Sequence, residues 1–143
     1  MKLNQDCLSQ EYLVSICPVN FFRSSEETDG TGVQKVMQSI LETKKWIFPI
    51  TAEAETGIVM DGNHRLQAAK LLGLRYLPAI LLRYDDPRVK VYFWGDNSHF
   101  DMSLIFEAVK KNVLLPQKTT RHVFTPTIQA SEIPLGLLLR EGN

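Results

Sequence analysis

The sequence has little cysteine: Cys7 and Cys17 are the two thiols among 143 residues. They form neither a CxxC pair nor a cluster with the spacing of metal ligands, which argues against disulfide-stabilised and zinc-stabilised frameworks. A chain of this length can bury a sufficient core without such crosslinks. We therefore predict reduced, structural cysteines and a single domain over residues 1–143.

Charge of one sign and long hydrophobic runs are also missing. Sixteen Lys and Arg balance sixteen Asp and Glu, so the broad positive field of a sequence-independent DNA-binding protein is absent. The N-terminal segment has no apolar stretch of signal-peptide length, and no later run is long and uncharged enough to span a bilayer. These features predict a cytoplasmic protein with neither a nucleic-acid nor a membrane partner.

Local patterns predict alternating short strands and helices. Apolar residues at helical spacing predict helices over about 32–44, from the segment after Asp61 to a stop at Gly73, and from Ser103 onward. Apolar and β-branched runs predict strands in YLVSIC, WIFPI, GIVM, YLPAILLRY and VKVYFW. The later segment LPQKTTRHVFTPT is predicted to be irregular. The pattern favours a compact α+β domain.

Polar residues gather where the strand GIVM meets the next helix, at Asp61, Gly62, Asn63, His64 and Arg65. A glycine permits a tight turn there, and the first amides of a helix attract anions. Arg65 can bind phosphate through two N–H groups, and Asn63 and His64 can add hydrogen bonds. Asp61 can hold a magnesium ion or accept a hydroxyl proton. The alternative is that Asp61 only caps the helix and the next residues form a solvated turn.

A second polar cluster comprises Lys118, Thr119, Thr120, Arg121 and His122. Two fixed cations, two hydroxyl groups and an imidazole within five positions suit the phosphates of a nucleotide. The alternative is a solvated basic loop. The sequence contains no Walker motif and no GxGxxG, so the two commonest nucleotide-binding signatures are excluded.

Three single positions allow two interpretations each. Glu26 and Glu27 precede a predicted helix, where carboxylates commonly cap the helix dipole, but either can serve as a catalytic base. Trp94 follows the strand VKVYFW beside Gly95, where a tryptophan forms part of the core or one wall of a ligand pocket.

Several segments together resemble a known superfamily. PVNFF, SSEETD, VQKVMQSI and GIVMDGNHRLQAAKLLGL are similar to the ParB-N/sulfiredoxin superfamily, which has a G-x-x-R element at the start of the corresponding helix. YDDPRVKVYFW and LLPQKTTRHVF resemble its free serine kinases, with their D-G-[HN]-H-R and P-x-K-[ST]-T-R-H motifs. The resemblance covers residues 14–124 or so, and implies an α+β fold with a small mixed sheet and flanking helices.

The resemblance implies a reaction and its participants. The terminal phosphate of ATP or ADP would pass, with Mg²⁺, to the hydroxyl of free L-serine and give O-phospho-L-serine. It implies that Glu26 is the general base. It also implies that Asp61, His64 and Arg65 lie at the magnesium ion and the nucleotide phosphates, where Asp61 is the metal ligand and Asp61 and His64 are catalytic. Gly62 belongs to the same phosphate-binding turn.

The resemblance also assigns the second cluster and leaves two questions open. Residues 118–122 would form the second phosphate loop, and Trp94, Arg121 and His122 would contact serine. Asn63 stands where these kinases usually have histidine and retains one donor and one acceptor group. Because Glu27 is adjacent to Glu26, the choice of base between them stays open.

The superfamily includes two other functions. A ParB-like nucleotide-dependent switch acting on DNA normally carries a helix-turn-helix region, for which little chain follows Phe124. Sulfiredoxin chemistry needs a reactive cysteine where this sequence has Asn63. The first function is therefore the alternative, and the second is excluded.

Overall fold

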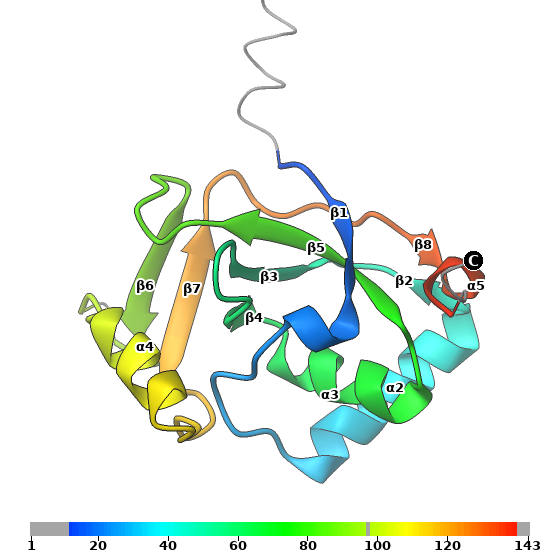
Figure 1. Cartoon of the computed structure of the whole chain (residues 1–143), viewed down its shortest axis with the longest axis horizontal. Helices are drawn as coiled ribbons and strands as arrows, with labels where there is room; N and C mark the ends of the chain where they lie inside the picture. Colours follow the sequence, from blue (N-terminus) through cyan, green and yellow to red (C-terminus); the bar gives the residue numbers. More distant parts are fainter. Residues whose placement is uncertain (1–11, 97, 140–143) are drawn as a thin grey trace, which may run out of the picture.

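The computed structural model describes residues 12–96 and 98–139 (Figure 1). The elements in chain order are β1 (Ser15–Pro18), the 3-10 turn η1 (Val19–Phe21), α2 (Gly30–Thr43), β2 (Lys45–Trp46), β3 (Ile50–Glu53), β4 (Val59–Asp61), α3 (Asn63–Leu72), β5 (Tyr76–Leu82), β6 (Val89–Phe93), α4 (Ser103–Lys110), β7 (Thr120–Phe124), β8 (Ile133–Pro134) and α5 (Leu135–Leu138). None of the helices in these described residues has the length and apolar character needed to cross a membrane.

A four-stranded mixed sheet in the order β1-β5-β3-β4 forms the centre of the fold. β5 and β3 run parallel, whereas the β1–β5 and β3–β4 pairs are antiparallel. β6 pairs with β7, and β2 pairs with β8, as separate antiparallel ribbons. The small mixed sheet with flanking helices confirms the predicted α+β class.

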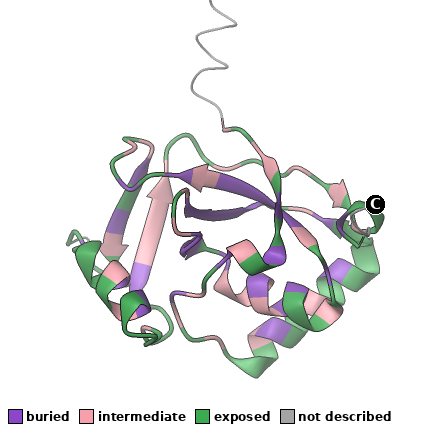
Figure 2. Cartoon of the chain, in the orientation of Figure 1, coloured by how far each residue is buried: buried purple, intermediate pink, exposed green. Residues whose placement is uncertain are grey.

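The two faces of the central sheet pack against different layers. Side chains alternate along a strand, so Leu77 and Ala79 of β5 enter one hydrophobic cluster while Ile80 and Leu82 enter another. The first cluster includes buried residues of α2 and α3, and the second includes buried residues of β6 and α4. Figure 2 shows β3 and β5 buried between these layers. The edge strand β4 contributes to both clusters, because Val59 belongs to the first and Met60 to the second.

The structure corrects three local predictions. α2 begins at Gly30, two residues before the predicted start at residue 32. The reason is that the Asp29 side chain accepts a hydrogen bond from the Gly32 N–H and caps the helix. β3 begins only at the end of WIFPI, after Pro49, and continues through polar residues. The prediction of an irregular tail is wrong, because residues 120–124 form β7 in register with all five residues of β6. β8 and α5 were not predicted.

Candidate active site

A cavity of about 400 Å³ lies between the first turn of α3 and the segment leading into β7. It joins the two polar motifs with the single positions selected from the sequence. The predicted residues on its lining are Glu26, Asp61, Gly62, Asn63, His64, Trp94, Lys118, Thr120, Arg121 and His122, together with Glu27. Arg65 and Thr119 are the two predicted residues that do not line it.

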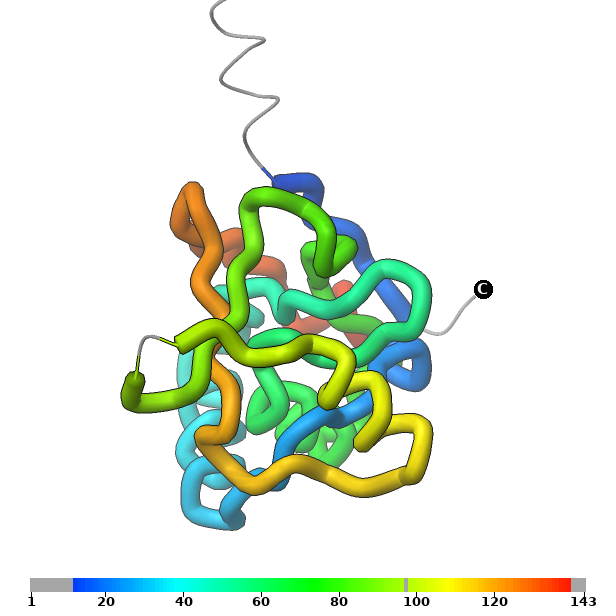
Figure 3. The backbone as a smooth tube through the Cα atoms, turned by 90° about the vertical axis from the view of Figure 1, so that its left-hand side faces the viewer, coloured from blue at the N-terminus to red at the C-terminus, as the bar shows by residue number. Residues whose placement is uncertain are grey.

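Glu26 connects the two motifs directly. Its Oε1 accepts a hydrogen bond from the Lys118 N–H at 3.1 Å, and its Oε2 accepts from the N–H and the hydroxyl of Thr120 at 2.9 and 2.6 Å. The neighbouring backbone forms a bridge to Leu115, and Figure 3 shows the segment before α2 running beside the segment before β7. The carboxylate thus holds residues 118–120 in place, and Glu26 is not a helix cap.

Gly62, and not Asp61, is the N-cap of α3. Gly62 has a φ of +123°, and a Cβ atom there would lie 2.9 Å from Ile50. This backbone turns the chain abruptly from β4 into α3 and leaves the carboxylate of Asp61 largely exposed. The interpretation of Asp61 as a cap is therefore wrong, and Asp61 lines the cavity instead.

Asn63 and His64 both bind the loop that carries the two glutamates. Oδ1 of Asn63 accepts from the backbone N–H of Ser25 at 2.9 Å, and Nε2 of His64 lies 2.9 Å from Oδ1 of Asp29. Hydrogen bonds from His64 and from the Gly32 N–H hold the pKa of Asp29 below its usual range. The first turn of α3 therefore positions the acidic loop as well as lining the cavity.

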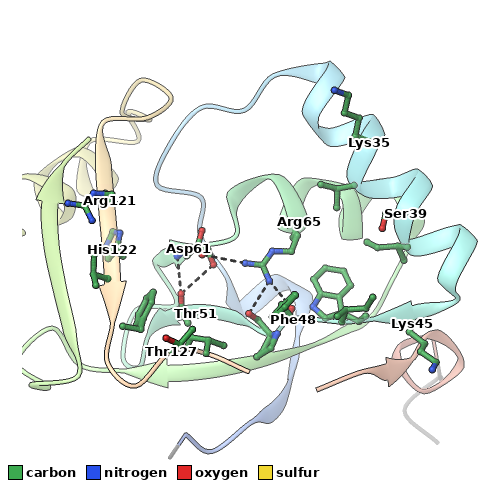
Figure 4. Close-up of a pocket in the computed structure, with 18 residues that line it drawn as sticks. Lys35, Ser39, Lys45, Phe48, Thr51, Asp61, Arg65, Arg121, His122 and Thr127 are labelled. Carbon is green, nitrogen blue, oxygen red and sulfur yellow. Dashed lines mark hydrogen bonds and ion pairs between the residues drawn. The ribbon is translucent and has the colours of Figure 1, made fainter. Parts of the chain in front are cut away.

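Arg65 faces a second, larger cavity of about 840 Å³. Its Nη1 donates to the carbonyl oxygens of Phe48 and Pro49 at 2.7 and 3.0 Å, and its Nη2 lies 3.8 Å from Oδ2 of Asp61 (Figure 4). Burial lowers the pKa of Arg65. The guanidinium thus stabilises the turn before β3, and in this structure its hydrogen bonds go to the protein backbone.

The larger cavity has mainly apolar walls and shares lining residues with the smaller one. Apolar side chains come from α2, from the segment around β2 and from β7 onward: Val36, Ile40, Trp46, Ile47, Phe48, Pro49, Val123, Phe124 and Ile128. Asp61, Arg121 and His122 line both cavities. Charged and apolar surfaces are therefore adjacent, with these three side chains at the junction.

β7 supplies an uncharged imidazole and a stacked cation. Nε2 of His122 lies 2.8 Å from the hydroxyl oxygen of Tyr84, and burial lowers the pKa of His122 to about 4. Burial also raises the pKa of Tyr84 above its ordinary value. The guanidinium of Arg121 lies 5.0 Å from the ring centroid of Tyr92. Near neutral pH this edge therefore carries one fixed cation and one neutral imidazole.

Trp94 and Lys118 meet at the wall of the smaller cavity. Trp94 is 50% exposed, so the core interpretation of this tryptophan is wrong. The ammonium group of Lys118 lies 5.9 Å from the ring centroid of Trp94, and the backbone N–H of Trp94 donates to the carbonyl of Thr119. The hydroxyl of Thr119 donates to the carbonyl of Pro116, which turns it onto its own loop.

The donor set suits a cation that is held partly by phosphate. Across residues 12–96 and 98–139, no group of three or more His, Cys, Asp or Glu side chains is placed to hold a metal ion. Mg²⁺ commonly binds one or two carboxylates together with substrate phosphates and water. The exposed carboxylate of Asp61 at the cavity junction fits that pattern.

Sequence patterns did not identify several contributors to the site. Ser25 and Asp29 anchor the acidic loop, Thr51 donates and accepts at the backbone of Asp61, and Tyr84 binds His122. Among these residues, only Asp29 has a local signal in the sequence, because an Asp directly before a helix start is typical of an N-cap. The other contacts join distant segments.

Known proteins resemble this chain in sequence and in fold. It is 31% identical over 74 residues to a ParB-like protein of Sulfolobus acidocaldarius, covering 48% of this chain and 37% of that relative. It is 31% identical over 90 residues to the ADP-dependent L-serine kinase SerK of Thermococcus kodakarensis, covering 57% of this chain and 37% of that relative. Each match thus spans little more than a third of the relative. No family model matches the chain.

Among solved structures, a free serine kinase in complex with AMP superposes with a TM-score of 0.79 at 14% identity. The superposition covers 90% of this chain and 94% of that chain. At this identity the likeness establishes a shared fold. The resemblance predicted from the sequence is therefore confirmed. The sequence relatives include a ParB-like protein and a serine kinase, and the fold is that of a free serine kinase.

Proposed function

We propose that this protein is a small-molecule kinase that transfers the terminal phosphate of a nucleotide to the hydroxyl of free L-serine. The observation that carries the proposal is the pair of adjoining cavities, one apolar and one polar, with Asp61, Arg121 and His122 lining both. An apolar cavity suits a nucleoside, and the polar cavity suits phosphates and a small zwitterion. The similarity to a serine kinase in sequence, and to another in fold, supports this assignment.

In phosphoryl transfer a protein mainly positions the reactants and neutralises the charge on the phosphates. In this proposal the nucleoside occupies the larger cavity, and the phosphates lie at its junction with the smaller one. Lys118 and Arg121 balance phosphate charge, and the neutral His122 offers a hydrogen bond. A magnesium ion, held by Asp61, would neutralise phosphate oxygens when bound. Arg65 would support the nucleoside cavity through its bonds to Phe48 and Pro49.

Glu26 is the proposed general base. A carboxylate oxygen has two lone-pair sites, and Oε1 of Glu26 accepts one hydrogen bond, from the Lys118 N–H. Its second site can accept the proton of the serine hydroxyl as the serine oxygen bonds to phosphorus and the bond to the leaving nucleotide oxygen breaks. Trp94, half exposed on the same cavity, forms a wall for the amino acid.

A direct assay tests this function. The purified protein is incubated with Mg²⁺, with ATP or ADP, and with serine, threonine, homoserine or glycerate, and products are identified by mass spectrometry. We expect O-phospho-L-serine to be the main product, and the comparison of ATP with ADP identifies the donor. Binding of nucleotide without phosphorylation of any acceptor would refute the kinase assignment.

The second candidate is a ParB-like nucleotide-binding or nucleotide-hydrolysing switch that acts alone or with DNA. The 31% identity to a ParB-like protein favours it. The assay above separates the two functions, because a switch would release inorganic phosphate or retain nucleotide while serine stays unmodified. The zero net charge still predicts that nucleic acid is not a partner.

A further inference from the structure

Both ends of the Asn63 amide are used inside the protein. Oδ1 accepts from the backbone N–H groups of Ser25 and Glu26, at 2.9 and 3.4 Å, and Nδ2 donates to the Ser25 hydroxyl oxygen at 3.1 Å. The Ser25 hydroxyl in turn donates to the carbonyl of Val59 at 2.8 Å, and Ser25 is buried. The amide is therefore committed to the acidic loop and to the end of the central sheet.

Glu26 is consequently fixed from two sides. Asn63, on the first turn of α3, binds the backbone at Glu26, while Lys118 and Thr120 bind its carboxylate. The two walls of the smaller cavity are thus joined through one residue, the proposed base. Moving the Ser25–Glu26 backbone would move the carboxylate relative to both walls.

We infer that Asn63 is a positioning residue for phosphoryl transfer, and that it holds the Glu26 carboxylate at its working place without binding phosphate itself. The inference rests on the proposed kinase function and reassigns Asn63 from the predicted phosphate contact. An asparagine suits this task because one short side chain supplies an acceptor for two N–H groups and a donor for a hydroxyl. A misplacement of about 1 Å at a reacting group can lower a rate by about a hundredfold.

Two variants of Asn63 and one matched control test the inference. Asn63→Leu keeps the side-chain size but removes both hydrogen-bonding ends, whereas Asn63→Asp keeps the acceptor. The control is Gln67→Leu, because Gln67 Nε2 donates to the Ser24 hydroxyl at 3.0 Å and holds the same loop without touching Glu26. We expect kcat to fall by about a hundredfold in Asn63→Leu and by less than about tenfold in Asn63→Asp. Gln67→Leu should stay near wild type.

Nucleotide affinity and amide exchange provide the readouts that a merely structural role would not reproduce. The nucleotide Kd of Asn63→Leu should stay within about twofold of wild type. The Ser25 amide should lose protection from hydrogen exchange in Asn63→Leu, which lacks the acceptor, but not in Asn63→Asp or Gln67→Leu. If Asn63→Leu does not fold, Asn63→Ala leaves room for water at the Ser25 amide and should show the same pattern.

Three outcomes would overturn the inference. The first is an unchanged kcat in Asn63→Leu despite the loss of amide protection. The second is a Kd for nucleotide raised about tenfold or more with kcat unchanged, which would restore Asn63 as a phosphate ligand. The third is a wild-type protein that phosphorylates no serine, which would remove the proposed function as well. An active wild type distinguishes the first two failures from the third.

Discussion

Protonation of the buried His122 imidazole at acidic pH should lower the free energy of unfolding. Its Nε2 lies 2.8 Å from the Tyr84 hydroxyl oxygen, its ring stacks on Phe124, and burial lowers its pKa from 6.5 to about 4. Between these values the unfolded chain binds a proton that the folded protein does not, so the free energy of unfolding rises with pH. Above pH 6.5 the free energy of unfolding is therefore undiminished by His122, and it decreases as the pH falls toward 4.

The size of the effect follows from the two pKa values. One pKa unit corresponds to about 1.36 kcal/mol, so this imidazole contributes a pH-dependent difference of about 3 kcal/mol over the full window. Between pH 7 and pH 4.5 most of it, about 2 kcal/mol, should be lost. That is a large part of the stability of an ordinary domain.

Urea denaturation of wild type and His122→Gln at pH 7 and pH 4.5 measures this loss. Glutamine can still hydrogen bond to Tyr84 but does not titrate, so contributions from the acidic residues cancel in the comparison. The wild type should lose about 2 kcal/mol more than the variant between the two pH values. Equal losses in both proteins would show that His122 is not held neutral by burial.

Five further substitutions have defined outcomes. Glu26→Gln should lower kcat for serine by roughly 10²–10⁴ with nucleotide affinity nearly unchanged. Glu27→Gln is the control and should have a much smaller effect. Equal steady-state rates in the wild type and both variants would exclude Glu26 as the base. Trp94→Ala should raise the KM for serine while unfolding stays cooperative, since the ring is half exposed. Lys118→Ala should weaken nucleotide binding in calorimetry by roughly 1.5–3 kcal/mol if one charged hydrogen bond is lost. Gly62→Ala should lower the free energy of unfolding by about 1–3 kcal/mol, because of its φ of +123° and the nearby Ile50.

The sequence predicted the elements whose signals are local. α3 is recognisable from its small apolar residues, and Gly73 ends it in a left-handed conformation, as predicted. The two polar motifs were also identified, and the structure places both on one cavity. Helical spacing and helix-stop residues act within a few positions of each other, so a single sequence retains them.

The features that the sequence did not predict depend on distant partners. Residues 120–122 carry polar side chains at the smaller cavity, and only the pairing of residues 120–124 with β6 makes this segment a strand. Likewise, Arg65 has the chemistry of a phosphate ligand, yet its guanidinium meets the carbonyls of Phe48 and Pro49. Which acceptor an arginine reaches depends on tertiary packing, and the residue type alone does not determine it.

The hydrogen bonds of Glu26 to Lys118 and Thr120 join positions 92 and 94 residues apart in the chain. Contacts of such separation require that a large loop has closed, so a chain in which this loop is open lacks the hydrogen bonds that complete the polar cavity. Such a chain would lack the proposed nucleotide site. A nucleotide that binds the completed cavity would therefore select finished molecules from a folding population, and at a hundred times its Kd it would stabilise them by about 2.7 kcal/mol.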